Sequence, residues 1–357
     1  MVRDFWRGRR VFITGHTGFK GSWLCRILKG FGAEVTGYAL PPPEGAHPFR
    51  LLDCEAGMHS VIGDIRDARR LADAFARAGA EIVIHMAALP LVLESYACPA
   101  ATFETNVMGT VNLFECVRGS ATVRSVINVT TDKVYRNREP ERGYREDDRL
   151  GGGGDPYSCS KACSEIVTAC YSGAFLADMA VSTVRSGNVI AGGDFSENRI
   201  IPDCVRAAER GEAIRIRNPG SVRPYQHVLE ALFAYMEVAR RQYGDPSLAG
   251  PYNVGPADSG CVTTGELADM FCRHWGDGLS WVRNGGHGRS EAGILRLDCT
   301  RMREVLGWRP VWSTDDAVAK TVEWEKIRLA RGDVRKAADR QIGDYLSVLV
   351  SGAGDRT

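Results

Sequence analysis

A regular alternation of strand-like and helix-like segments in the first half of the chain constrains its fold more than any other feature of the sequence. Short runs rich in β-branched and aromatic residues, which predict strands, alternate with stretches whose apolar residues recur at helical spacing. The predicted strands cover 11–14, 34–39, 59–62, 81–86, 125–130 and 180–184, and the predicted helices cover 23–31, 71–78, 105–117 and 157–171. This alternation predicts an α/β fold in which helices cover both faces of a mainly parallel, doubly wound sheet.

The charge balance and the hydropathy pattern exclude several classes of protein. Lys plus Arg number 45 against 44 for Asp plus Glu, so the formal charge of +1 provides no overall field to hold nucleic acid or an anionic membrane. The longest apolar stretch, 82–93, is interrupted by His85 and Pro90 and is shorter than the roughly 20 residues that cross a bilayer. The basic N-terminus lacks the apolar core of a secretory signal, so we expect a cytoplasmic protein.

The 11 cysteines are odd in number and include no Cys-x-x-Cys pair. Several lie in helix-like apolar patterns, where a reduced thiol packs as a small hydrophobe: Cys25, Cys116, Cys163 and Cys170. A zinc site at Cys159 and Cys163 is the alternative, but no second ligand pair follows at metal-site spacing. We therefore expect no metal.

A glycine-rich turn stands between the first predicted strand and the first predicted helix. The segment Thr14-Gly-His-Thr-Gly-Phe-Lys-Gly21 has glycines at positions 15, 18 and 21. Backbone N–H groups and the helix dipole at such a turn can meet a pyrophosphate, which favours a bound dinucleotide over a plain tight turn. Asp64, after the third strand, is placed to accept a hydrogen bond from an adenine amine, although it would also be unremarkable as a surface acid.

The second predicted strand leaves the choice of nicotinamide cofactor open. It ends Gly37-Tyr-Ala-Leu40, without the Asp or Glu that binds the ribose 2′-hydroxyl of NAD. No Arg for the 2′-phosphate of NADP follows directly, and Arg50 is too far along the chain to assign. We predict NAD and keep NADP as the alternative.

After Arg185 the regular pattern loosens, and Gly- and Pro-containing segments surround helical stretches near 204–210 and 228–240. This predicts a second, smaller α/β lobe. We expect an NAD-binding Rossmann-type domain over 1–187 plus about 225–255, a substrate lobe over 188–224 and 256–345, and a tail over 346–357 in which 351–357 fray.

Tyr157 and Lys161 are four residues apart, which places both side chains on one face of a predicted helix. An ammonium group beside a phenol lowers the pKa of the phenol, so that the phenol can take a proton from a substrate alcohol as hydride leaves. Thr131, at the end of the preceding strand, can hold the same hydroxyl. Tyr-x-x-x-Lys also occurs by chance in helices, but the glycine-rich turn and this strand end favour the catalytic interpretation.

These motifs resemble those of the extended short-chain dehydrogenases/reductases, and among them the CDP-glucose 4,6-dehydratases, over nearly the whole chain. The similar segments are 14–24, 130–135, 143–152, 155–161, 187–190, 201–203, 216–219, 223–229 and 297–300. The most specific are Phe19-Lys20 in the glycine turn and the Asp132-Lys133 pair. The resemblance implies a Rossmann-type NAD-dependent lyase of deoxysugar biosynthesis that takes a nucleotide sugar, CDP-glucose.

The resemblance also implies the catalytic roles. Tyr157, supported by Lys161 and Thr131, deprotonates the C4 hydroxyl of the sugar while hydride passes to NAD. Asp132 takes the position of the acid that protonates the departing C6 hydroxyl, and Lys133 that of the C5 base, where other sugar-nucleotide dehydratases have Glu. A lysine abstracts a proton only when neutral, so we predict that burial near Lys161 or the cofactor lowers the pKa of Lys133. The alternative is a solvated ion pair at a strand end.

Two sets of binding residues follow from the same resemblance. The NAD set is Gly15, Thr17, Gly18, Phe19, Lys20, Gly21, Asp64, Ile65, Ala87, Ala88, Asn106, Tyr157 and Lys161. The nucleotide-sugar set is Asn188 at the diphosphate together with Arg199, Arg217 and Arg223, of which the last two are cationic forks. Any of these arginines could instead form a rim ion pair, and His227 is expected to be a packed residue rather than a catalyst.

Three positions depart from the family pattern. Leu89 stands where the family usually has Gln, Leu93 where it has Arg, and Ser290 where a His is common. Leucines remove polar contacts beside cofactor and substrate, which keeps three hypotheses open: a CDP-glucose 4,6-dehydratase, a related nucleotide-sugar epimerase or reductase, and a non-catalytic cofactor-binding homologue. The intact tyrosine, lysine, threonine and aspartate argue against the last.

The predicted helices 105–117 and 157–171 carry apolar residues on more than one face. The resemblance implies that they pair into the four-helix bundle of a homodimer. A monomer that covers these faces with its own second lobe is the alternative.

Overall fold

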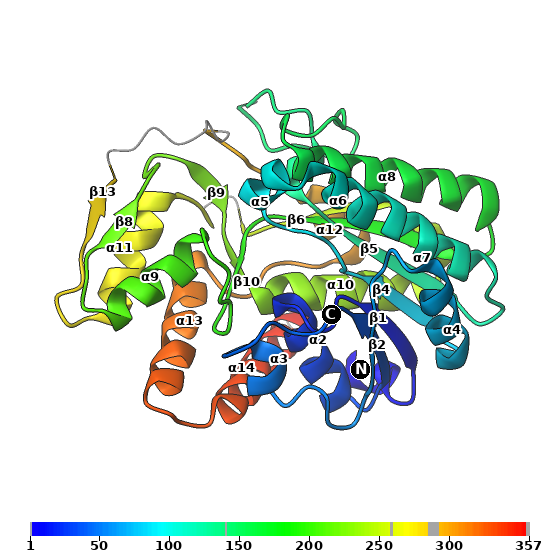
Figure 1. The fold of residues 1–357 in the computed structure, drawn as a ribbon, viewed down its shortest axis with the longest axis horizontal. Coiled ribbons are helices and arrows are strands. Elements are labelled where there is room, and N and C mark those ends of the chain that lie inside the picture. The colour runs from blue at the N-terminus through cyan, green and yellow to red at the C-terminus, as the bar shows by residue number, and fades with distance from the viewer. Residues whose placement is uncertain (1, 140, 258–259, 285–292, 355–357) are drawn as a thin grey trace.

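The computed structural model describes residues 2–139, 141–257, 260–284 and 293–354, and shows a parallel sheet between two layers of helices (Figure 1). The sheet has seven strands in the order β11-β6-β5-β4-β1-β2-β3. Their bounds are β1 (Arg10–Thr14), β2 (Glu34–Ala39), β3 (His59–Ile62), β4 (Ile82–His85), β5 (Ser125–Thr131), β6 (Ala180–Ser186) and β11 (Pro251–Val254). Successive strands are added toward one edge of the sheet from β1 to β3 and toward the other edge from β4 onward, so the strand order reverses between β1 and β4. Open α/β sheets bind ligands at this point. The Rossmann-type fold is confirmed.

Helices cover both faces of the sheet because the strands alternate their side chains between two apolar cores. Val11 and Ile13 of β1 pack in one core, and Phe12 packs in the other. On the first face lie α2 (Phe19–Gly30) and α10 (Val228–Gly244), and on the second lie α4 (Ala68–Ala78), α7 (Gly109–Arg118) and α8 (Pro156–Phe175). Burial on both faces explains why the strands are nearly continuous apolar runs.

The part of the chain after β6 adds a smaller group of elements with its own core, at the left of Figure 1. Strands β8 (Ile214–Ile216) and β13 (Trp281–Arg283) pair in parallel, and β9 (Val222–Pro224) and β12 (Cys261–Thr263) pair antiparallel. The helices are α9 (Ile200–Glu209), α11 (Thr264–Trp275) and α13 (Thr314–Leu329). A two-residue pairing of β7 (Val189–Ile190) with β10 (Gln226–His227) joins this lobe to α10 and the sheet.

The remaining elements are short, apart from the last helix. They are α1 (Val2–Trp6), α3 (Pro48–Leu51), α5 (Val92–Ala97), α6 (Pro99–Phe103), η1 (Glu104–Met108), η2 (Asp132–Val134), η3 (Pro246–Leu248), α12 (Thr300–Leu306) and α14 (Val334–Gly354). Within the described ranges, no helix is long and apolar enough to cross a membrane.

Two elements differ from the expectation. Residues 104–108 form a turn of π-helix before α7, where the sequence predicts one regular helix over 105–117. The tail expected over 346–357 is helical as far as Gly354, because α14 continues to that residue. Leu346 and Leu349 of this helix pack against the main core, so apolar contact rather than composition decides where the helix ends. Residues 355–357 lie outside the described residues.

A buried carboxyl group, Glu230 of α10, joins three parts of the chain. Its Oε1 accepts hydrogen bonds from the backbone N–H groups of Val311 (2.8 Å) and Trp312 (2.6 Å), and its Oε2 accepts one from the Tyr345 hydroxyl (2.8 Å). Burial raises the pKa of Glu230 to about 7, against the effect of these donors. The folded state therefore keeps a proton that the unfolded chain releases near pH 4.5, and stability falls as the pH rises from about 4.5 to 7.

We expect Glu230→Gln to remove this pH dependence. The variant should match the original protein at pH 4.5 and be more stable above pH 7, by about 3 kcal/mol, because an amide has no charge to desolvate. Urea unfolding at both pH values measures the difference. Glu237→Gln on the same helix is the control, since it removes only a partly exposed ion pair with Arg240. An unchanged slope in Glu230→Gln would contradict the assignment.

Candidate active site

A pocket of about 550 Å³ lies between the carboxyl ends of the sheet strands and the second lobe. The sheet side contributes Lys20, Thr131, Lys133, Tyr157 and Ser186, and the lobe side contributes Asn188, Arg199, Arg215, Arg217 and Arg223. The four residues expected to bind the nucleotide sugar therefore line one pocket together with three of the five expected catalytic residues. The other two, Asp132 and Lys161, are buried and lie behind this lining.

Tyr157 stands in the first turn of α8, where Asp155 caps the helix and Pro156 fixes its first residue. Lys161 lies one turn further on, and its ammonium group donates to the Val129 carbonyl at 2.9 Å. Burial and repulsion from Lys20 lower the pKa of Lys161 to about 7.

The phenol of Tyr157 is not activated by the lysine alone. Burial raises the pKa of Tyr157 to about 12, and a hydrogen bond with the Thr131 side chain offsets only part of that rise. The net pKa of this phenol is therefore raised, and the effect expected from Lys161 stays a prediction. Deprotonation near neutral pH requires a further positive charge in the pocket.

Asp132 and Lys133 form an ion pair in η2, directly after β5. Lys133 Nζ lies 3.2 Å from Asp132 Oδ1, and the Thr131 hydroxyl donates to the same oxygen at 2.9 Å. Asp132 is completely buried, and its Oδ2 has no hydrogen-bond partner among the described residues. The carboxylate of this pair is therefore shielded from solvent, and only Lys133 lines the pocket.

The sequence predicts a buried Lys133 side chain, but the structure shows that it is partly exposed. It is 28% exposed, and its Nζ contacts Asp132 and, at 3.4 Å, the Asn188 Oδ1. The pKa of the Lys161 ammonium is shifted by the charges of Lys20 and Glu165. Proximity in sequence to Asp132 gives Lys133 a carboxylate partner, and that contact holds it at the rim of the pocket.

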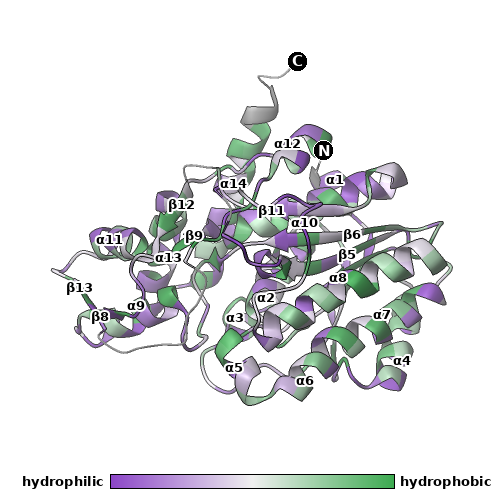
Figure 2. Cartoon of the chain, turned by 90° about the horizontal axis from the view of Figure 1, so that it is seen from above, coloured by the Kyte–Doolittle hydropathy of each residue, from purple (hydrophilic) through white to green (hydrophobic). Residues whose placement is uncertain are grey.

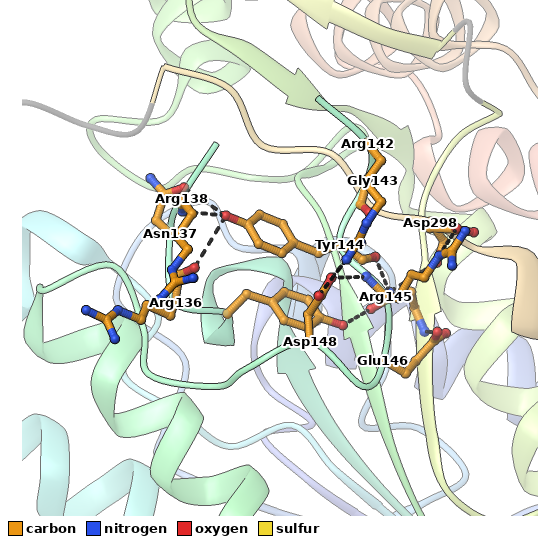
Figure 3. Close-up of polar contacts among 12 residues, drawn as sticks. Arg136, Asn137, Arg138, Arg142, Gly143, Tyr144, Arg145, Glu146, Asp148 and Asp298 are labelled. Carbon is orange, nitrogen blue, oxygen red and sulfur yellow. Dashed lines mark hydrogen bonds and ion pairs between the residues drawn. The ribbon is translucent and has the colours of Figure 1, made fainter. Parts of the chain in front are cut away.

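The chain that follows η2 ties this strand end to the segment just before α12 (Figure 3). The Tyr144 ring stacks on Tyr135 with centroids 4.9 Å apart, and the Tyr144 hydroxyl accepts a hydrogen bond from the Arg138 N–H at 2.7 Å. The Tyr144 carbonyl accepts the Asp298 N–H at 2.8 Å, and Arg145 pairs with the Asp298 carboxylate at 2.9 Å. We call residues 135–139 and 141–150 the strap, because they connect the catalytic strand end to residues 296–298.

The arginines of the pocket are held in different ways. Arg199 pairs with Asp194 at 3.0 Å, which is the rim ion pair left open by the sequence. Arg223 is buried and donates to the backbone carbonyls of Val222 (2.9 Å) and Gly293 (3.3 Å). Arg217 is exposed, and Arg215 lies two residues before it on β8, with the same exposure. Sequence reasoning missed Arg215, although the period of two along a strand is the signal that could have found it.

The positions that depart from the family pattern differ in placement. Leu93 lines the pocket and is 37% exposed. The backbone of Leu89, not its side chain, is held by Asn106, whose Oδ1 accepts the Leu89 N–H at 2.8 Å. Ser290 lies outside the described residues. Leu93 is therefore the departure among the described residues that changes the pocket wall.

The glycine turn forms a cradle with no room for side chains. Gly15 has φ +77°, and a Cβ there would lie 2.8 Å from the Ala87 nitrogen; a Cβ on Gly21 would lie 2.2 Å from the Gly15 oxygen. Gly18 caps α2 without a side-chain hydrogen bond, so the first N–H groups of the helix face outward. This arrangement fits a dinucleotide phosphate.

The other expected cofactor residues surround the same edge of the sheet. The Thr17 hydroxyl donates to the Leu40 carbonyl at 2.8 Å and fixes the turn against the end of β2. Asp64 pairs with Arg66 at 2.6 Å, and this hydrogen bond lowers the pKa of its carboxyl group. The adenine contact predicted for Asp64 therefore competes with a basic partner that the sequence reasoning did not assign.

Replacing Gly21 with alanine is expected to weaken NAD binding about 10- to 100-fold, because the new methyl group would force the turn apart at a cost of about 1–3 kcal/mol. Isothermal titration with NAD measures the change. Gly30→Ala in the same helix is the matched control, since nothing lies within 4 Å of its added Cβ. Equal NAD affinity in the two variants would show that the turn does not hold the cofactor.

Comparison with known proteins agrees with this geometry. A CDP-glucose 4,6-dehydratase of Salmonella typhimurium is 43% identical over 353 residues, which cover 97% of this chain and 98% of the relative. The solved DesIV dTDP-glucose 4,6-dehydratase of Streptomyces venezuelae, with NAD and TYD bound, superposes with a TM-score of 0.77 at 24% identity and covers 91% of this chain and 99% of its own. A UDP-glucose 4-epimerase of Thermotoga maritima with UDP-glucose gives a TM-score of 0.78 at 21% identity, covering 89% and 99%.

The model of the family described as "NAD dependent epimerase/dehydratase family" matches residues 11–255 of this chain. These residues include the glycine turn, the catalytic strand end and Tyr157. The resemblance drawn from the motifs is thereby confirmed. This chain belongs to the NAD-dependent epimerase/dehydratase family of extended short-chain dehydrogenases/reductases.

Proposed function

We propose that this protein is an NAD-dependent nucleotide-sugar 4,6-dehydratase that converts CDP-glucose to CDP-4-keto-6-deoxyglucose. One observation carries the proposal: Thr131, Lys133 and Tyr157 line the same pocket as the cationic side chains of the second lobe. Similarity along nearly the whole chain to a CDP-glucose 4,6-dehydratase supports the choice of base and sugar. The product class, a 4-keto-6-deoxysugar nucleotide, places the enzyme in deoxysugar biosynthesis.

The first chemical task is to remove hydrogen from C4 of the sugar. Bound at the glycine turn, NAD would supply a hydride acceptor for C4, a hydride donor for C6 and a positive charge in the pocket. Tyr157 takes the proton of the C4 hydroxyl, and the Thr131 hydroxyl next to it orients that group. Lys161, at the Val129 carbonyl, adds a second positive charge in its protonated form.

The second task is to eliminate water across C5 and C6. The C4 carbonyl acidifies the C5 hydrogen, so a base of moderate strength suffices. Lys133 and Asp132 share one proton across 3.2 Å, and its transfer to the carboxylate gives the neutral amine and the carboxylic acid that this step needs. The amine then takes the C5 proton, and the acid protonates the departing hydroxyl. When C6 has received hydride, the Lys133 ammonium returns a proton to C5, and the proton held by Tyr157 passes through solvent to the Lys133–Asp132 pair, which restores the starting state.

The nucleotide end of the substrate is assigned to the lobe side of the pocket. Asn188, Arg217 and Arg223 supply donors for the diphosphate, and Arg215 of β8, two residues before Arg217, adds a further positive charge. Leu93 forms part of the apolar wall across the pocket and makes no polar contact with a sugar hydroxyl. We therefore assign specificity mainly to the arginine side.

Incubation with NAD and CDP-glucose in D₂O tests the function. We expect loss of one water by mass spectrometry and deuterium at C5, with a higher kcat/KM than for UDP-glucose or dTDP-glucose. A product that keeps all its oxygen atoms would identify an epimerase or reductase. An unchanged sugar at saturating NAD would favour a non-catalytic cofactor-binding homologue and overturn the proposal.

We also propose a homodimer that works in the cytoplasm. Helices α7 and α8 lie side by side at one edge of the molecule (Figure 2). Met108, just before α7, is 51% exposed, and Ile166 and Phe175 of α8 are 59% and 55% exposed. These side chains suit a four-helix contact with a second copy. The 11 cysteines are all free thiols, which suits a reducing compartment.

A further inference from the structure

A series of buried hydrogen bonds starts where the glycine turn leaves the sheet. Thr14 ends β1 and His85 ends β4, and the Thr14 Oγ1 lies 2.6 Å from the His85 Nδ1. The other ring nitrogen, His85 Nε2, lies 3.1 Å from the Thr110 Oγ1 on α7. These three side chains are at most 1% exposed, and none of them lines the pocket.

The same series continues from Thr110 to the first turn of α8. The Thr110 hydroxyl donates to the Asn106 carbonyl at 2.7 Å. The Asn106 Nδ2 donates to the Ser160 Oγ at 2.9 Å, and the Ser160 hydroxyl donates to the Tyr157 carbonyl at 2.8 Å. Asn106 lies in η1, a turn of π-helix, and such irregular turns are frequent at functional sites. The series therefore ends at the backbone of Tyr157.

The positions of the hydrogen atoms around His85 follow from its partners. The Thr14 Oγ1 accepts the backbone N–H groups of Met86 and Ala87, each at 3.1 Å, so its own proton points to the His85 Nδ1. His85 therefore carries its proton on Nε2 and donates to Thr110. Burial lowers the pKa of His85 to about 3, which keeps the ring neutral. A buried network whose donors and acceptors match in this way is rigid.

The series also holds the segment 86–89, which packs on the glycine turn. The Asn106 Oδ1 accepts the Leu89 N–H at 2.8 Å, and the Asn106 Nδ2 donates to the Leu89 carbonyl at 3.2 Å. The packing is close, since a Cβ on Gly15 would lie 2.8 Å from the Ala87 nitrogen. The turn expected to hold the cofactor and the helix that carries Tyr157 are thus attached to one network.

We propose that Thr110 is a positioning residue for hydride transfer, whose hydroxyl sets the separation between the glycine turn and Tyr157. The inference rests on the proposed function, in which hydride leaves C4 as Tyr157 takes the proton of the C4 hydroxyl. Both groups must reach the same carbon, and a misplacement of about 1 Å can cost about 100-fold in rate. Thr110 does not line the pocket, so it acts through the His85 ring and the Asn106 carbonyl.

Thr110→Val tests this role, because it removes the hydroxyl and keeps the shape of the side chain. We expect the kcat for CDP-glucose to fall about 10- to 100-fold, while the Kd for NAD changes less than about threefold because the glycine turn itself is intact. Thr110→Ser keeps the hydroxyl and should restore most of the kcat. Steady-state rates at saturating NAD and isothermal titration with NAD measure the two effects. An unchanged kcat, or a loss confined to NAD affinity, would refute the positioning role.

Thr168→Val is the matched control for lost buried hydrogen bonds. The Thr168 hydroxyl is also buried, lies 2.7 Å from the Asn128 Nδ2 and donates to the Ser164 carbonyl at 2.7 Å, outside the series that reaches Tyr157. Urea unfolding should show that this variant, like Thr110→Val, loses stability. Its kcat should nevertheless stay within about threefold of the original. Equal losses of kcat in the two valine variants would show a general loss of packing and overturn the proposal.

Ser160→Ala provides a second cut in the series if Thr110→Val fails to fold. It removes the link between Asn106 and the Tyr157 carbonyl, and we expect the same fall in kcat with unchanged NAD affinity. If the original enzyme releases no water from CDP-glucose, the proposed function fails and the positioning role fails with it. If water is released and neither Thr110→Val nor Ser160→Ala lowers the kcat, only the positioning role fails.

Discussion

Replacing Tyr157 with phenylalanine is expected to lower the kcat for CDP-glucose about 10²- to 10⁴-fold while NAD still binds. The variant loses the group that takes the proton of the C4 hydroxyl but keeps the ring that fills the pocket wall. Steady-state rates and isothermal titration with NAD measure the two effects separately.

Tyr171→Phe is the control for this experiment. Tyr171 lies on the same helix, but its hydroxyl donates to Glu115 at 2.7 Å, at the far end from the pocket. We expect its kcat to stay within about twofold, since an exposed hydrogen bond contributes little. Comparable activity of Tyr157→Phe and Tyr171→Phe would remove the tyrosine from the mechanism.

Replacing Arg185 with methionine is expected to destabilise the fold by about 3–5 kcal/mol, because it leaves the Glu165 carboxylate buried without a cation. The two side chains are 4% and 3% exposed, and Arg185 Nη2 lies 2.8 Å from Glu165 Oε2. Arg185 also donates to the Tyr135 hydroxyl at 2.9 Å. The pair connects β6 to the helix that carries Tyr157.

Urea unfolding measures this loss, and two further variants interpret it. Adding Glu165→Gln to Arg185→Met should recover part of the stability, since the uncompensated charge is then gone. Arg118→Met breaks an exposed pair with Glu115 and should cost far less stability than Arg185→Met. A loss in Arg185→Met no larger than in Arg118→Met would show that the buried pair does not hold the helix.

The main sheet was predictable because most of its strands are apolar along their whole length. Burial on both faces makes β1, β4, β5 and β6 read as largely apolar runs. The predicted ends of β1 to β6 agree with the structure to within two residues. The second lobe was not predictable in this detail. Its strands have two or three residues each, too few for a period of two to emerge, and they depend on pairing with distant segments.

The candidate site likewise has a part that was predictable from the sequence and a part that was not. The glycine turn and the Tyr157–Lys161 spacing are local in sequence, so their chemistry was predictable from the motifs. The electrostatic state of each group was not, because it depends on neighbours far along the chain. Lys20, for example, repels Lys161 from another element, and Asn188 contacts Lys133 from the second lobe.

The strap defines where a substrate can enter. Its Tyr144 contacts Asp298, and its Glu139 carboxylate accepts the Gly293 N–H at 2.6 Å, so the lobe is fastened to the sheet along this side. Swinging the lobe away would break these contacts together. We expect the nucleotide sugar to enter instead past residues 90–94 and 197–203, which line the pocket. Substrate can then enter and product can leave without moving the catalytic strand end between turnovers.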